Sequence, residues 1–211
     1  MTSPSSRFPR LHRVGAGPPL VLLHGLGASR MTWRGLSPLH LQFECITLDL
    51  PGHGDTPAPD EPYEIDGLAE QFAACLTADG IERAHLLGSS LGGMVALNFA
   101  ATWPGRVDRM VLCDTTPAFS EGMREELLTM PDVGFAHGAM ARADLMDLAE
   151  EVFARTLVLC AEGADLAMRE GADFLARSMP RGELAFVPGA ERDVVMEQPG
   201  WVARVVADFL R

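Results

Sequence analysis

Short apolar runs alternate along the chain with segments in which apolar residues recur at helical spacing. The runs predict strands at Leu20–His24, Phe43–Leu48, Ala84–Leu87, Arg109–Cys113, Thr156–Cys160 and Leu184–Val187. The segments between them predict helices near Met31–Leu36, Ile65–Ala78, Leu91–Thr102, Arg169–Met179 and Trp201–Leu210. Several runs are apolar throughout, which is typical of strands buried on both faces. The pattern therefore predicts an α/β fold with a mostly parallel sheet covered by helices on both faces.

One segment interrupts this alternation. Residues Thr115–Arg155 are rich in Met, Ala and acidic side chains and contain no strand pattern. We expect this segment to form a small helical cap on a core made of residues 1–114 and 156–211. A length of 211 residues favours a single domain.

Composition narrows the function classes. A net charge of −12 argues against nucleic acid and anionic membrane surfaces as partners. No apolar run reaches the roughly 18 residues that span a bilayer, and the first residues lack the apolar core of a signal peptide. The cysteines are far apart in apolar segments, as expected for free thiols in a reducing cytoplasm: Cys45, Cys75, Cys113 and Cys160. We therefore expect a cytoplasmic protein that needs no metal or other cofactor and acts on a small molecule.

The main chemical motif is a G-x-S-x-G sequence from Gly88 to Gly92, with Ser90 at its centre. An apolar strand precedes it and a predicted helix follows. A Ser on such a sharp turn has an exposed hydroxyl, and the N-terminus of the next helix stabilises negative charge beside it. The motif predicts that Ser90 is a nucleophile. The alternative is a small residue required only by the tight turn.

Two further loops follow predicted strands, His24-Gly25-Leu26-Gly27 and the segment from Asp49 to Gly54. Their order and spacing with the Ser90 turn resemble the α/β-hydrolase fold. Within that superfamily the chain resembles the 3-oxoadipate enol-lactonase group of small esterases and lactonases, including the stretches 107–114 and 187–199. The resemblance implies an oxyanion hole made by the backbone N–H groups of Leu26 and Leu91.

The resemblance also implies a His near the C-terminal end and an acid after a late strand, and here the chain departs from the pattern. A gap-free count through Pro188-Gly189-Ala190 puts Arg192 at the His position. Arginine stays protonated and accepts no hydrogen bond, so it cannot act as the base. Arg192 is either a surface residue paired with Glu191 or Asp193, or a fixed cation in the pocket that could hold a substrate carboxylate. The acid position falls on Ala164, with Asp165 one residue later.

Three residues are candidates for the missing acid and base. Asp165 is either a triad acid or a solvated loop carboxylate, and Asp114 is either an acid at the end of a strand or a cap of the following turn. His137, in the predicted cap, either reaches over Ser90 or faces solvent. Two functions remain open at this stage. One is a hydrolase of small esters or lactones with an altered acid/base pair; the other is a non-hydrolytic enzyme, such as a lyase or cyclase, or a ligand-binding pseudoenzyme.

Overall fold

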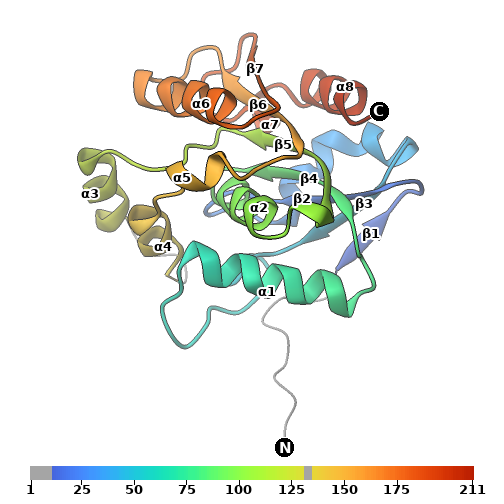
Figure 1. Ribbon diagram of the computed structural model, residues 1–211, viewed down its shortest axis with the longest axis horizontal. Coiled ribbons are helices and arrows are strands. Elements are labelled where there is room, and N and C mark those ends of the chain that lie inside the picture. The colour runs from blue at the N-terminus through green and yellow to red at the C-terminus, as the bar shows by residue number, and fades with distance from the viewer. Residues whose placement is uncertain (1–10, 131–134) are drawn as a thin grey trace, which may run out of the picture.

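A seven-stranded sheet forms the centre of the computed structural model, which describes residues 11–130 and 135–211 (Figure 1). The strands are β1 (His12–Val14), β2 (Pro19–Leu23), β3 (Glu44–Leu48), β4 (Ala84–Ser89), β5 (Val107–Cys113), β6 (Arg155–Ala161) and β7 (Gly182–Val187). Their order across the sheet is β1-β3-β2-β4-β5-β6-β7. Only β1 is antiparallel to its neighbour. The α/β prediction and all six predicted strands are therefore confirmed.

Helices cover both faces of this sheet. One apolar cluster joins the sheet to α1 (Ile65–Ala78), α2 (Leu91–Thr102) and α6 (Leu166–Ser178). A second joins the other face to η1 (Arg30–Leu41), α7 (Val194–Glu197) and α8 (Pro199–Leu210). A short turn of 3-10 helix, η2 (Pro104–Arg106), links α2 to β5. The layered arrangement follows directly from strands that are apolar on both sides.

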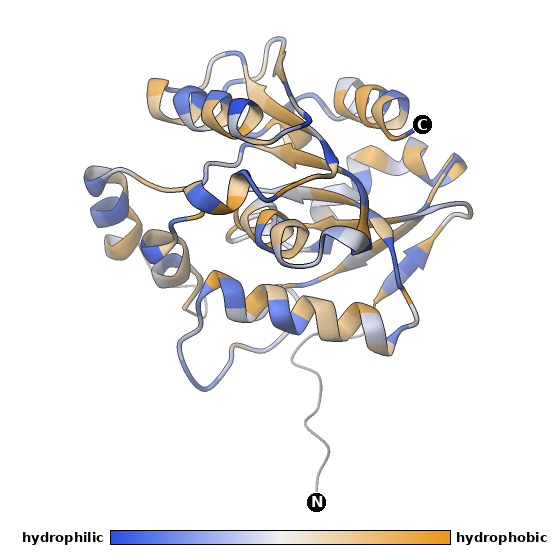
Figure 2. Cartoon of the chain, viewed as in Figure 1, coloured by the Kyte–Doolittle hydropathy of each residue, from blue (hydrophilic) through white to orange (hydrophobic). Residues whose placement is uncertain are grey.

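The helix predictions differ in quality. The bounds predicted for α1 and α2 are those observed. The helix predicted at residues 31–36 is instead a longer 3-10 segment, with non-helical backbone at Leu36 and Pro38 inside it. Figure 2 shows that α2 is apolar around most of its surface, whereas α1, α6 and α8 each carry a polar side. Accordingly, every residue of α2 from Leu91 to Ala100 is buried.

Between β5 and β6 the described chain forms α3 (Glu121–Thr129), α4 (Ala136–Arg142) and α5 (Met146–Ala149). Figure 1 shows α3 and α4 together at one side of the molecule, away from α8. An isolated bridge between Ala118 and Asp144 ties the two ends of this segment together. Residues 131–134 of the predicted cap lie outside the described part.

The four cysteines are free and buried, as predicted. Burial raises the pKa of Cys45, Cys75 and Cys160 to about 11, so these thiols stay protonated at neutral pH. Among the helices of the described residues, none has the length and apolar character that a bilayer span requires.

Candidate active site

Ser90 occupies a strained turn between β4 and α2. Its backbone has φ 49° and ψ −115°, a combination that residues other than Gly rarely adopt. The turn is held on both sides, because the Ser90 N–H donates to the Cys113 carbonyl at 3.0 Å and its carbonyl accepts from the Met94 N–H at 3.0 Å. The side chain is half-buried. The sharp strand-to-helix turn predicted from the motif is therefore present.

Close backbone contacts explain the glycines around Ser90. A Cβ at Gly92 would overlap the carbonyl of Leu23, and one at Gly88 would lie 2.6 Å from the carbonyl oxygen of Gly92. The loop after β2 approaches the turn equally closely, since a Cβ at Gly25 would lie 3.3 Å from the Cβ of Ser90. The first turn of α2 is thus packed directly against the end of β2.

Two backbone N–H groups near this contact have no protein acceptor within the described residues. One belongs to Leu91, the first residue of α2, and the other to Leu26, which follows Gly25. Donors at the start of a helix are suited to an oxygen that becomes negative during a reaction. The arrangement can therefore accept an anionic oxygen beside Ser90 without any side-chain donor.

His24 and Asp49 fix the two glycine-containing loops. His24 is buried; its Nδ1 donates to the Gly25 carbonyl at 2.8 Å, and its Nε2 accepts from the Leu50 N–H at 2.9 Å. Burial lowers the pKa of His24 to about 4, so the ring is neutral. Asp49 forms an ion pair with the Arg30 side chain and also accepts the backbone N–H of Arg30 at 2.6 Å. Both side chains hold loop structure.

Asp114 directly follows β5 and is the most perturbed carboxyl group near the Ser90 turn. Its backbone has φ 45°. Its Oδ2 accepts the Val194 N–H at 2.9 Å, whereas its Oδ1 is buried with no hydrogen-bond partner. Burial raises the pKa of Asp114 to about 7, and the nearby carboxylates of Asp193 and Glu197 add to that rise. Val194, which donates to this carboxylate, is thus on α7, far along the chain, rather than in the turn that follows Asp114.

The loop that should carry the family His is organised around Glu197. Its carboxylate accepts three consecutive backbone N–H groups, those of Glu191 at 2.7 Å, Arg192 at 2.9 Å and Asp193 at 2.8 Å. These hydrogen bonds lower the pKa of Glu197. Arg192 itself is exposed and forms no ion pair within the described residues. Sequence reasoning did not single out Glu197, although an acidic residue in the first turn of a helix is a known capping pattern.

The other two acid/base candidates lie in different surroundings. Asp165 is exposed and is the N-cap of α6, where its carboxylate accepts the Met168 N–H at 2.9 Å. His137 on α4 is buried, so the solvent-facing alternative is wrong. It lies close enough to His53 to lower the pKa of that imidazole, in the same direction as the larger effect of burial. His53 donates from Nδ1 to the Pro51 carbonyl at 3.0 Å, and its buried Nε2 has no hydrogen-bond partner.

Comparison with known proteins agrees with this geometry. Residues 18–142, more than half of the chain, match the family model described as alpha/beta hydrolase fold. The protein therefore belongs to the α/β-hydrolase family.

Its curated relatives include pimeloyl-[acyl-carrier protein] methyl ester esterases. The chain is 40% identical to the enzyme of Aeromonas hydrophila over 111 residues, which are 52% of this chain and 42% of that esterase. It is 35% identical to the enzyme of Edwardsiella ictaluri over 161 residues, covering 75% of this chain and 58% of the relative. The chain thus matches only part of the length of these esterases.

Solved structures resemble nearly the whole chain. The enol-lactonase of Burkholderia xenovorans LB400 superimposes with a TM-score of 0.85 at 21% identity, covering 95% of each chain. A thermophilic esterase of Thermogutta terrifontis gives a TM-score of 0.86 at 24% identity, covering 96% of this chain and 92% of that one. At such low identity the similarity establishes the fold alone.

Proposed function

We propose that this protein hydrolyses small carboxylic esters or lactones, with Ser90 as the nucleophile. The strained backbone of Ser90 at the start of α2 is the observation that carries the proposal. In the first step the Ser90 oxygen bonds to the carbonyl carbon, and the carbonyl oxygen becomes an oxyanion. The N–H groups of Leu26 and Leu91 stabilise that oxyanion, and the ester C–O bond then breaks as the alcohol or ring oxygen leaves with the proton taken from Ser90. Water hydrolyses the acyl-enzyme, which releases the acid and returns a proton to Ser90. The ester and lactone activities in the names of two similar proteins support this class.

The base in this proposal is Asp114. Ser89 and Cys113 are partners in the β4–β5 ladder, so Ser90 and Asp114 follow the ends of adjacent strands. A pKa of about 7 leaves much of the Asp114 carboxyl ionised at neutral pH, and the backbone N–H groups of Val194 and Ala161 favour the ionised form. A base whose pKa lies near the working pH transfers protons efficiently. It is nevertheless a weaker arrangement than an oriented imidazole, so we expect slow turnover.

Arg192 and the segment after Asp114 complete the proposed site. The Arg192 guanidinium is exposed and without an ion pair among the described residues, and Arg192 lies two residues before Val194, whose N–H donates to Asp114. We assign it the binding of a carboxylate on the substrate. Residues 115–155 are the proposed cap of this end of the fold. No cofactor takes part in the reaction, and the proposed site of action is the cytoplasm.

Fluorophosphonate labelling, with mass spectrometry to locate the adduct, tests both the nucleophile and the base. We expect slow labelling of Ser90 in the wild-type protein and none in Ser90→Ala. Asp114→Asn should slow labelling at least about tenfold, because the proton acceptor is lost. The matched control Asp165→Asn keeps an N-cap residue and should leave the rate unchanged. A large loss in Asp165→Asn or His137→Gln, with Asp114→Asn unaffected, would assign the base elsewhere.

A second candidate function is favoured by one observation. The loop at residues 191–193 is fully organised by Glu197, without an imidazole. This arrangement suits a non-hydrolytic enzyme, such as a lyase or cyclase, or a ligand-binding protein with the same fold. Absence of both labelling and p-nitrophenyl acetate hydrolysis above the Ser90→Ala background would favour this candidate. Binding of a small carboxylate that is lost in Arg192→Gln would then identify the protein as a ligand binder.

A further inference from the structure

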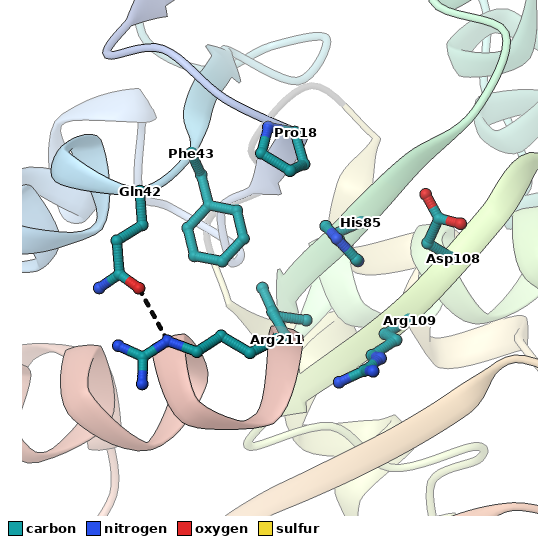
Figure 3. A pocket seen from close by; sticks show the side chains of 8 residues that line it. Pro18, Gln42, Phe43, His85, Asp108, Arg109 and Arg211 are labelled. Carbon is teal, nitrogen blue, oxygen red and sulfur yellow. Dashed lines mark hydrogen bonds between the residues drawn. The ribbon is translucent and has the colours of Figure 1, made fainter.

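A pocket of about 480 Å³ opens at the edge of the sheet where the parallel strands begin, opposite the edge that carries Ser90. Figure 3 shows it between Pro18, Phe43, His85 and Arg109. Pro18 and Phe43 immediately precede β2 and β3, and His85 is the second residue of β4. The proposed hydrolysis uses none of these residues.

A β-bulge places the polar side chains of this pocket. Ala84 pairs with Val107 and Leu86 pairs with Met110, so His85 alone on β4 faces both Asp108 and Arg109 on β5. Bulges are rare between parallel strands and are over-represented beside functional sites, where they re-aim a side chain. The extra residue in β5 is therefore an independent indication that this edge of the sheet has a role.

His85 is the unusual group in the pocket. It is 8% exposed, its ring lies edge-on to the Phe43 ring at 5.8 Å between centroids, and its Nδ1 is buried with no hydrogen-bond partner. Burial lowers the pKa of His85, which favours the neutral ring. Since a buried N–H without an acceptor is unfavourable, the proton belongs on Nε2. His85 therefore offers a ligand one N–H donor beside the apolar side chains of Pro18 and Phe43.

Arg109 supplies the available positive charge. One of its N–H groups donates to the Phe209 carbonyl at the end of α8, and it forms no ion pair within the described residues. The neighbouring carboxylate of Asp108 is paired with Arg83 at 2.7 Å. Figure 3 shows Arg211 turned away to bond Gln42, at 3.0 Å. In a chain with a net charge of −12, an unpaired guanidinium beside a pocket marks a local preference for an anion.

We propose that this pocket binds a small organic carboxylate with a flat apolar body. Arg109 pairs with the carboxylate through its remaining N–H groups, and the body lies against Pro18, Phe43 and Leu210 with His85 donating from Nε2. The apolar part of the lining favours an organic anion over inorganic phosphate. The site is separate from Ser90, so the inference does not depend on the proposed function.

Titration of the ¹⁵N-labelled histidine rings with benzoate, followed by NMR, tests the proposal. We expect benzoate to shift the His85 ring signals, which His85→Gln assigns. Arg109→Gln should weaken this binding about tenfold or more, because a hydrogen-bonded charge pair is lost. The matched control Arg177→Gln removes an exposed Arg whose ion pair, with Asp173, lies within α6, and it should bind benzoate as the wild type does. Benzamide, which has the same ring without the charge, should bind far more weakly.

Three outcomes would overturn the proposal: no His85 shift at millimolar benzoate, equal binding of benzamide, or unchanged binding in folded Arg109→Gln. If phosphate binds as tightly as benzoate, the proposed preference for an organic carboxylate is wrong. If Arg109→Gln does not fold, His85→Leu replaces it, with calorimetry as the readout and the same expected loss. Fluorophosphonate labelling of Ser90 in each variant reveals any disturbance that reaches the other end of the sheet.

Discussion

The two sides of the Ser90 site are built in different ways. One side is formed by backbone groups. The first turn of α2 packs against the end of β2, and both ring nitrogens of buried His24 are hydrogen bonded to backbone groups of the neighbouring loops. On the other side, side chains define the chemistry. There Asp114 has one buried oxygen without a partner, and Glu197 holds the loop that contains Arg192, which we propose to stand in place of the expected imidazole. The oxyanion site that we propose is independent of the side chains at Leu26 and Leu91, whereas a single substitution removes an acid/base pair.

Gly92→Ala is the substitution that should break the backbone-built side. The added Cβ would overlap the Leu23 carbonyl, and neither backbone can move without opening the sheet. We expect a loss of more than about 4 kcal/mol in the free energy of unfolding, measured by urea denaturation. Gly67→Ala is the matched control, because it lies in the first turn of α1 with no atom within 4 Å of its added Cβ. That control should stabilise the protein slightly, and similar losses in both variants would contradict the packing argument.

Asp114→Asn tests the side of the site that side chains define, through its effect on the free energy of unfolding. The pKa of Asp114 is about 7 in the folded protein and near 4 in the unfolded chain. The stability that the protonated Asp114 contributes is therefore fully present below pH 4 and is lost as pH rises through 7, because only the unfolded chain ionises easily. Asn stays neutral at every pH. We therefore expect Asp114→Asn to be about 4 kcal/mol more stable than the wild type at pH 8 and nearly equal to it at pH 4. Urea titrations at the two pH values measure this, and a pH-independent difference would show that charge is not the cause.

Arg192→His would supply an imidazole at the position where the family has one. If the backbone-built side is competent, hydrolysis of neutral p-nitrophenyl acetate should rise roughly 100-fold, the lower range of general-base catalysis. Arg192→Gln controls for loss of the charge and should show no rise. The double variant Arg192→His with Asp114→Asn should lose most of the gain, because an asparagine at position 114 carries no charge to stabilise the protonated imidazole. No gain in the single variant would mean that position 192 lies outside the reacting site.

Asp165→Ala has the smallest expected effect. Asp165 caps α6 by accepting the Met168 N–H, so its removal should lower the unfolding free energy by about 1 kcal/mol. Ser90 labelling should be unchanged, since the proposal gives Asp165 no part in proton transfer. A loss of labelling out of proportion to that small destabilisation would restore Asp165 as the catalytic acid.

The sequence predicted the parts of the structure that depend on local pattern. Helix α2 and the Ser90 turn were predicted because the glycines, the apolar run and Pro104 lie next to one another in the chain. Strand β1 was not predicted, because its three residues are exposed and carry no apolar pattern. The bulge facing His85 depends on the register between β4 and β5, which no single strand encodes.

The acid/base side was least predictable for the same reason. The interactions of Asp114 with Val194 and of Glu197 with the loop amides join segments through the fold. The raised pKa of Asp114 follows from how deeply that contact is buried. Local pattern identified Asp114 only as one of several acidic residues near strand ends.

Helix α2 also determines how long the strain at Ser90 can persist. Because Leu91 to Ala100 are all buried, solvent reaches the amides of this helix only when the surrounding layers separate. Hydrogen exchange in α2 should therefore report global unfolding rather than local fraying. The backbone of Ser90 is joined directly to that helix, so its strained backbone conformation cannot relax through local unfolding. It is retained for the lifetime of each folded molecule.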